Sequence, residues 1–199
     1  MFAQNRLSID SCVCALRLRL AALLLCSLLP GFSHADDPGE FLVDDAHAWS
    51  EAGRQMLDAQ FTVRLSSGAQ EALESGVPLV LEFQVQLVKI HKWFWDMVDV
   101  ELTQRRQLQY HALSRSYLVK DLDAGTQGNY RRLDDALRAV GTIQNLLLTD
   151  KPLQVGQRYL VRIRGSLDIE SLPTPVRLLA YVSSAWDMQS EWYSWPLVR

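Results

Sequence analysis

Long segments of the sequence alternate apolar and polar residues with a period of two, and this pattern restricts the fold more than any other feature. A strand sends successive side chains to opposite faces of a sheet, so the alternation predicts strands that bury one face. Parallel strands, which are covered on both faces, would read as unbroken apolar runs. The apolar positions of the four longest segments are Leu57, Ala59, Phe61, Val63 and Leu65; Leu79, Leu81, Phe83, Val85 and Leu87; Val98, Val100, Leu102, Leu108 and Tyr110; and Tyr159, Val161, Ile163, Leu167 and Ile169. A mainly antiparallel β protein is therefore expected.

Shorter strands are predicted over residues 41–49, 117–122, 143–148 and 176–182. Together the segments give about eight strands at intervals of roughly ten residues, a spacing typical of all-β sandwiches. The predicted fold is an antiparallel β-sandwich, with an Ig-like arrangement or an open barrel as alternatives.

Two short helices are expected between these strands. Residues 67–70 have the spacing of a capping box that begins at Ser67, and Gly76 and Pro78 are placed to end that helix. The second helix precedes Gly141 and has one apolar stripe, formed by Leu133, Ala136, Leu137 and Val140. Helices this short need tertiary packing, so both are expected to lie on a sheet.

The first 35 residues have the layout of a signal peptide. Arg6, Arg17 and Arg19 precede the apolar run LAALLLCSLL, and small residues follow at Ser33 and Ala35. A helix that crosses a bilayer needs about 20 apolar residues, which is more than this run offers. We therefore predict cleavage before Asp36, export to the periplasm, and a mature chain of residues 36–199 that forms one β-rich domain.

All three cysteines, Cys12, Cys14 and Cys26, lie in this leader. Leu25 precedes Cys26, whereas lipid-modification signals normally have a small residue there, so a lipid anchor is not expected. The mature chain has no cysteine and can form no disulfide, even in an oxidising compartment. Its stability must come from an ordinary core.

The charge balance argues against nucleic-acid binding. Without residues 1–35 the chain keeps 17 basic and 22 acidic residues, which gives a net charge of −5. Non-specific binding to nucleic acid depends on a basic surface that neutralises phosphates. We expect the partner to be an envelope protein or a membrane surface instead.

Catalytic groupings are missing from the sequence. The histidines of the mature chain, His47, His91 and His111, stand in no HExxH or HxH array, and no GxSxG elbow occurs. We therefore expect no catalytic, metal-binding or cofactor-binding residues, and an enzyme is the less favoured interpretation. One alternative keeps a small-ligand or enzyme site inside the sandwich, built from Tyr110, His111 and Arg115.

The stretch HKWFWDM, residues 91–97, joins two long predicted strands. It is either a hairpin tip or a bend in the strand pair. In a hairpin, alternation would send Trp93 and Trp95 to one side and Phe94 to the other, so at least one aromatic side chain would lie outside the core. The three aromatic residues are candidates for binding a partner.

Three arginines, Arg158, Arg162 and Arg164, are separated by even intervals in one predicted strand and should form a basic row on one face. Such a row commonly pairs with acids on neighbouring strands, for instance Glu82, Asp99 or Glu101. In the functional interpretation the row instead faces lipid head groups, anionic glycan or an acidic partner.

The end of the chain contains the phrase LPTP, in which Pro173 and Pro175 cannot donate to a sheet ladder. The phrase therefore predicts a connection between strands, with Asp168 accepting hydrogen bonds from the backbone of the turn. The large aromatic residues Trp186, Trp192 and Trp195 are expected to close one end of the core.

Several phrases together resemble an exported bacterial family catalogued as domain of unknown function 4390. They are GVPLVLEFQV, WFWD, RRQLQYHALSRSYLV, LDDALRAVGTI and GQRYLVRIRGSLDIESLPTPVRLLAYVSSAWDMQSEW. The most specific part is LDxxxLPxP, at Leu167–Asp168 to Pro175. The resemblance implies a signal peptide and a β-rich body with no assigned activity. It also implies genes that often lie beside a membrane sensor kinase, so modulation of such a kinase is a further hypothesis.

These observations together predict an exported binding or accessory module of the cell envelope. The aromatic residues at 93–95 and the adjacent sheet edge are the expected contact with a protein or membrane partner.

Overall fold

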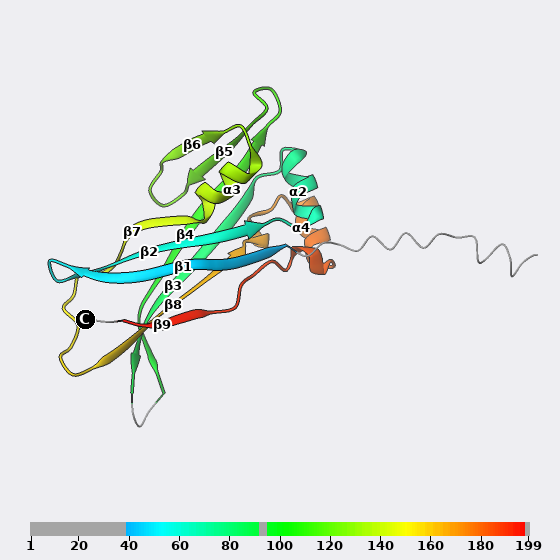
Figure 1. Ribbon diagram of the computed structural model, residues 1–199. Coiled ribbons are helices and arrows are strands. Elements are labelled where there is room, and N and C mark those ends of the chain that lie inside the picture. The colour runs from blue at the N-terminus through cyan, green and yellow to red at the C-terminus, as the bar shows by residue number, and fades with distance from the viewer. Residues whose placement is uncertain (1–38, 92–94, 198–199) are drawn as a thin grey trace, which may run out of the picture. The chain divides into compact units, whose positions relative to one another are not determined.

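The amphipathic segments form antiparallel strands in two sheets, as the computed structural model shows (Figure 1). The structure describes residues 39–91 and 95–197, and residues Asp36–Arg199 belong to one compact unit. The described strands are β1 (Glu40–Glu51), β2 (Arg54–Arg64), β3 (Leu79–Ile90), β4 (Met97–His111), β5 (Ser116–Asp121), β6 (Gln127–Tyr130), β7 (Thr142–Thr149), β8 (Arg158–Leu167) and β9 (Tyr193–Pro196). The described helices are α2 (Ser67–Glu74), α3 (Leu133–Gly141) and α4 (Thr174–Ala180), with short 3₁₀ turns η1 (Ile169–Ser171) and η2 (Ser184–Trp186).

The smaller sheet has the order β1-β2-β7, and the larger has the order β6-β5-β4-β3-β8-β9. The pairs between these strands are antiparallel. The prediction of a mainly antiparallel, two-sheet protein is confirmed.

Aromatic rings fill the space between the sheets. The ring of Phe83 on β3 lies 4.7 Å from that of Phe61 on β2 and 6.3 Å from that of Phe41 on β1. Gly165 on β8 pairs with Phe83, and a Cβ there would lie 2.6 Å from the Phe41 ring. The missing side chain at Gly165 therefore lets Phe41 pack directly on the large sheet.

The strand predicted over residues 176–182 is wrong, because most of this segment lies in α4. Pro173 is the N-cap residue and Pro175 stands in the first turn, where a proline's fixed φ fits a helix and its missing N–H costs nothing. The LPTP phrase therefore starts a helix and does not join two strands. Residues 39–91 and 95–197 thus contain one more α-helix than predicted, as well as the short edge strands β6 and β9.

The first helix begins one residue earlier than its capping box predicted. The side chain of Ser66, which is fully buried, accepts a hydrogen bond from the Ala69 amide at 3.3 Å. Ser66 is therefore the N-cap, and Ser67 is the first helical residue.

This assignment predicts different effects for two adjacent serines. Replacing Ser66 with alanine removes the cap acceptor and should lower the free energy of unfolding by about 1 kcal/mol. Replacing Ser67 with alanine should change it by less than about 0.5 kcal/mol. Urea denaturation of both variants measures the difference, and a larger loss from Ser67→Ala would contradict the assignment.

The second predicted helix is α3, and its apolar stripe faces inward as expected. Ala136 and Val140 are fully buried, and Leu133 and Leu137 pack against the core. Gly141 is the last helical residue; a Cβ there would clash with the backbone carbonyl of Phe61 on β2. The glycine therefore allows α3 to approach the small sheet closely.

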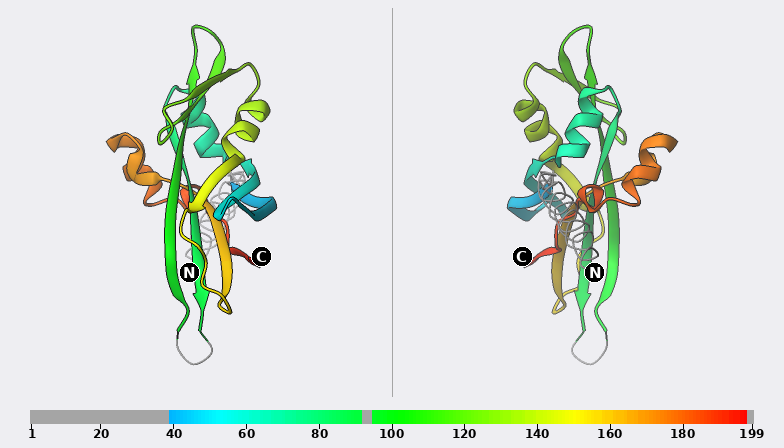
Figure 2. Two further views of the ribbon diagram at one scale, coloured as in Figure 1. Left: turned by 90° about the vertical axis from the view of Figure 1, so that its left-hand side faces the viewer. Right: turned by 90° about the vertical axis from the view of Figure 1, so that its right-hand side faces the viewer.

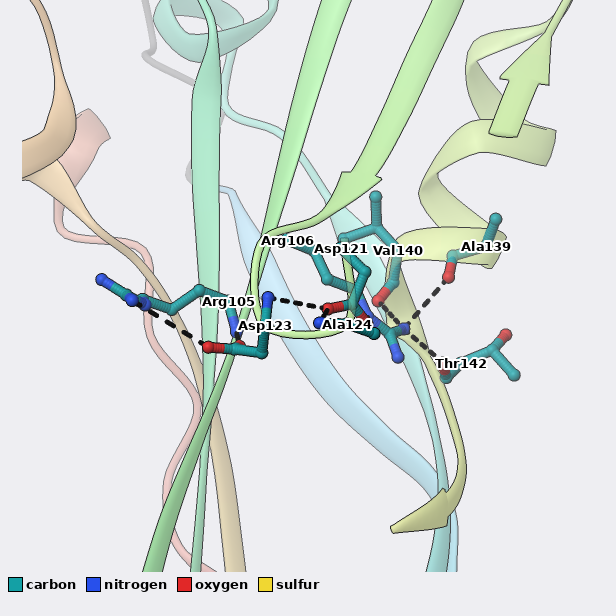
Figure 3. Close-up of polar contacts among 8 residues, drawn as sticks. All are labelled: Arg105, Arg106, Asp121, Asp123, Ala124, Ala139, Val140 and Thr142. Carbon is teal, nitrogen blue, oxygen red and sulfur yellow. Dashed lines mark hydrogen bonds and ion pairs between the residues drawn. The ribbon is translucent and has the colours of Figure 1, made fainter. Parts of the chain in front are cut away.

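An arginine holds the end of α3 to the large sheet (Figure 3). Arg106 on β4 donates to the carbonyls of Ala139, at 3.2 Å, and Val140, at 2.8 Å, and also to that of Thr142. Its guanidinium forms an ion pair with Asp121 on β5, and both side chains are less than one fifth exposed. Burial lowers the pKa of Arg106, and the charge of Asp121 opposes that shift. The last carbonyls of α3 thus gain a fixed cationic donor.

The C-terminal segment contributes to the core largely as predicted. Trp186 is buried, and its indole lies beside Gly68 of α2. Trp195 packs against the core and is partly buried. Asp168 accepts a hydrogen bond from the Glu170 amide at 3.0 Å, the role predicted for it. Trp192, by contrast, lies against two arginines.

Candidate functional site

The β3–β4 hairpin ends in an apolar tip, which we define by the described residues Trp95, Met97 and Val98. The Trp95 side chain is 88% exposed, that of Met97 59% and that of Val98 41%. Figure 2 shows the adjoining ends of β3 and β4 near the bottom of both views. Trp93 and Phe94 lie outside the described residues. The structure therefore places Trp95 outside the core.

A β-bulge explains why Val98 leaves the apolar face that the alternation predicted for it. The β3–β4 register shifts between Leu87 and Val88, so that Leu87 pairs with Val100 while Val88 pairs with Val98. The extra residue, Asp99, breaks the parity of the strand. Val100 and Leu102 pack against the core, but Val98 is exposed.

Polar contacts fix the strand ends beside the tip. Gln157 donates to the Ile90 carbonyl, and the Lys89 ammonium donates to the Gln154 side chain at 2.6 Å. The backbone amide of His91 contacts the Asp96 carboxylate at 3.4 Å. The tip thus consists of exposed apolar side chains, and hydrogen bonds hold the strand ends that adjoin it.

The basic row lies on the outer face of the large sheet, as predicted. Arg162 and Arg164 alternate with the buried residues Val161 and Ile163, and Arg158 is exposed farther along the same strand. The expected pairing of the row with Glu82, Asp99 or Glu101 is wrong for the two inner arginines. Among the described residues, no ion pair involves either of them.

Glutamines on β3 take the place of the expected acids. The register pairs Gln84 with Arg164 and Gln86 with Arg162. Arg164 donates to the Gln84 side-chain oxygen at 2.8 Å, and Arg162 donates to that of Gln86 at 3.0 Å. Both guanidinium groups also lie over the Trp192 ring, at 4.6 Å for Arg164 and 5.6 Å for Arg162.

The residues of the predicted internal site do not converge inside the sandwich. Tyr110 stacks on Tyr117, with ring centres 5.0 Å apart. His111, the last residue of β4, and Arg115, in the turn that follows it, are both exposed, and Arg115 has a positive φ of 49°. Apolar side chains fill the interior between the sheets.

A second apolar surface, which the sequence analysis missed, lies on α4. We call it the α4 patch; its side chains are each more than half exposed and are Leu178, Leu179, Tyr181 and Val182. In Figure 2, α4 and the small sheet stand on opposite sides of the β3–β4 hairpin. The proline at the start of α4 was the sequence signal that could have revealed this helix.

Three contacts connect the α4 patch to the rest of the domain. Ala180 is buried, and Glu170 forms an ion pair with Arg177 at 3.6 Å. Tyr181 donates a hydrogen bond to the Glu170 carboxylate, and this bond raises the pKa of the Tyr181 hydroxyl. A hollow of about 520 Å³ beside the patch is lined by Trp186 and other residues.

Residues 39–91 and 95–197 show neither a metal-binding cluster nor a membrane-spanning helix. No cluster of three or more histidine, cysteine, aspartate or glutamate side chains in these ranges is arranged to hold a metal ion. None of the helices within them is long and apolar enough to cross a membrane.

A family model described as "Domain of unknown function (DUF4390)" matches residues 39–196. No curated protein and no solved structure matches the chain. The match spans the two sheets, the hairpin with its tip, and α4.

Proposed function

The chain belongs to the DUF4390 family, and from the geometry of this member we propose that it is an exported binding module that docks on an envelope protein through its tip. The observation that carries the proposal is the exposure of Trp95, at 88%, beside Met97 and Val98. Soluble domains rarely keep a large aromatic side chain among other apolar ones in water unless a partner covers it. Tryptophan is also the residue type most enriched at the energetic centres of interfaces.

Acids adjoin the tip residues directly and favour a protein partner, whereas the cations beside the tip, Lys89 and Arg158, lie on the neighbouring strands β3 and β8. Asp96 and Asp99 adjoin the apolar residues, and both are exposed. The anionic surface of a bilayer would repel these carboxylates. A protein pocket can accept the apolar side chains and offer basic groups to the two acids.

The α4 patch offers a second contact surface. Its side chains are each more than half exposed, so a partner that covers them would bury apolar surface. A module with two separate apolar surfaces can bind one partner at two places or connect two partners. Modulation of a membrane sensor kinase is a special case of this proposal, in which the kinase is the protein that contacts the tip.

Replacing Trp95 with alanine should reduce the yield of partner crosslinked in the native envelope by at least about tenfold, in line with a contact worth 1.4 kcal/mol or more. The change should alter the free energy of unfolding by less than about 0.5 kcal/mol, because the side chain is exposed. Quantitative crosslinking followed by mass spectrometry measures the first effect, and urea denaturation measures the second.

Leu113 provides the matched control, since it is fully exposed in a different hairpin turn. Leu113→Ala should leave capture unchanged. Equal capture by the wild type and Trp95→Ala would contradict the proposal. Binding of the purified wild type, but not of Trp95→Ala, to protein-free vesicles would replace the protein partner with a membrane surface.

A further inference from the structure

Two adjacent guanidinium groups on the outer face of the large sheet share one aromatic ring and have no carboxylate partner in the described part of the chain. They belong to Arg162 and Arg164, and the ring is that of Trp192. The two residues are neighbours on the same face of β8. We propose that this arginine pair is a binding site for a phosphate dianion.

The nearest acids on the strand face are engaged elsewhere. Glu82 accepts a hydrogen bond from the Gln84 amide nitrogen at 2.6 Å, and Glu101 accepts one from the Gln86 amide nitrogen at 2.9 Å. Each glutamine therefore turns its amide nitrogen to an acid and its oxygen to an arginine. The carboxylates orient the glutamines, and the glutamines orient the guanidinium groups.

This arrangement fixes both guanidinium groups before any ligand arrives. Each has one glutamine acceptor, at 2.8 Å for Arg164 and 3.0 Å for Arg162, and each is packed against Trp192. An arginine has five N–H donors, so one neutral acceptor leaves most of them unused. The Nε of Arg162 is buried without a hydrogen-bond partner among the described residues, so the donors of Arg162 that a ligand can meet are those of its terminal nitrogens. Little side-chain entropy remains to be lost on binding.

The two positive charges of the arginine pair favour a ligand that carries two negative charges. Two like charges side by side repel each other, and glutamine oxygens and an aromatic face offset this only in part. A carboxylate would neutralise one of the two cations. A phosphate monoester or inorganic phosphate carries about −1.5 to −2 at pH 7 and has three acceptor oxygens, so it matches both guanidinium groups.

The inference stands apart from the proposed docking through the tip. It uses residues of β3, β8 and the segment before β9, and none of the tip. Failure of one proposal therefore leaves the other intact.

Titration of the wild-type protein with inorganic phosphate at pH 7.5 and constant ionic strength tests the site. The ¹⁵N NMR signals of the two arginine Nε groups and of the Trp192 indole should shift saturably, whereas chloride should leave them unchanged. The double variant Arg162→Gln/Arg164→Gln should bind phosphate at least tenfold more weakly.

Two further variants make the result specific. Arg105→Gln removes a positive charge from β4, which β3 separates from β8, and where Arg105 pairs with Asp123 at 3.9 Å; this variant should bind phosphate within twofold of the wild type. Arg162→Lys/Arg164→Lys keeps the charge but loses the planar donors, so its affinity should fall between the wild type and the glutamine variant. Equal affinity of the wild type and the glutamine variant, or equal shifts with chloride, would overturn the proposal.

The phosphate group can be free or carried by a lipid, and vesicles distinguish these sources. Arginine-dependent binding to vesicles of phosphatidylcholine with phosphatidic acid, but not to vesicles with phosphatidylglycerol, would assign a lipid phosphomonoester. A saturable response to inorganic phosphate without vesicle binding would assign a soluble phosphate ligand. Absence of both responses would overturn the site.

Discussion

Replacing Arg106 with methionine is expected to lower the free energy of unfolding by about 3 kcal/mol, because it breaks a largely buried ion pair and removes the donor for three carbonyls. The remaining carboxylate of Asp121, which is 17% exposed, would lose its cationic partner. For a domain of this size, the melting temperature should fall by about 10 °C. Thermal denaturation followed by circular dichroism measures the change.

The neighbouring residue on β4 supplies the control for this prediction. Arg105 points to the opposite face, and its side chain is 52% exposed. Arg105→Met should cost less than about 1 kcal/mol, the usual limit for a surface ion pair. Similar losses from the two substitutions would show that the contacts of Arg106 with α3 add nothing to stability.

Replacing Phe83 with alanine is expected to lower the free energy of unfolding by about 4 kcal/mol. The side chain is completely buried between the sheets, and its ring contacts those of Phe61 and Phe41. Alanine would leave a cavity beside the rings of Phe41 and Phe61, which β1 and β2 of the small sheet hold in place. Urea denaturation at several temperatures measures the loss.

A comparison with Trp95→Ala shows whether burial or side-chain size determines the loss of unfolding free energy. Tryptophan is the larger side chain, yet Trp95 is exposed, so its removal should cost less than about 0.5 kcal/mol. A loss below about 1 kcal/mol for Phe83→Ala would contradict the assignment of Phe83 to the centre of the core.

The sequence predicted the long strands well because one buried face gives each of them an alternating pattern. Residues 57–65 and 79–87 lie in β2 and β3 with their apolar positions turned inward, apart from the last residue of the first segment, which follows β2. Residues 176–182 were misassigned because an apolar run of that length fits either a strand or a helix. Pro175, in the first turn of α4, is the residue that favours the helix over the strand.

Side-chain partners were harder to predict, since they depend on register. Alternation placed Arg162 and Arg164 on one face correctly, but only the β3–β8 register shows that glutamines face them. A shift of two residues would have brought Glu82 opposite Arg164. The partners of Arg106 on α3 are more than thirty residues away in sequence, and no local pattern indicates them.

The central claim is that the tip is the surface that meets a protein partner, and site-specific photocrosslinking tests it most directly. A photoreactive amino acid placed at position 95 in cells should give one dominant protein adduct, and the same group at position 113 should give little or none. Equal adducts from both positions, or none from position 95, would contradict the claim.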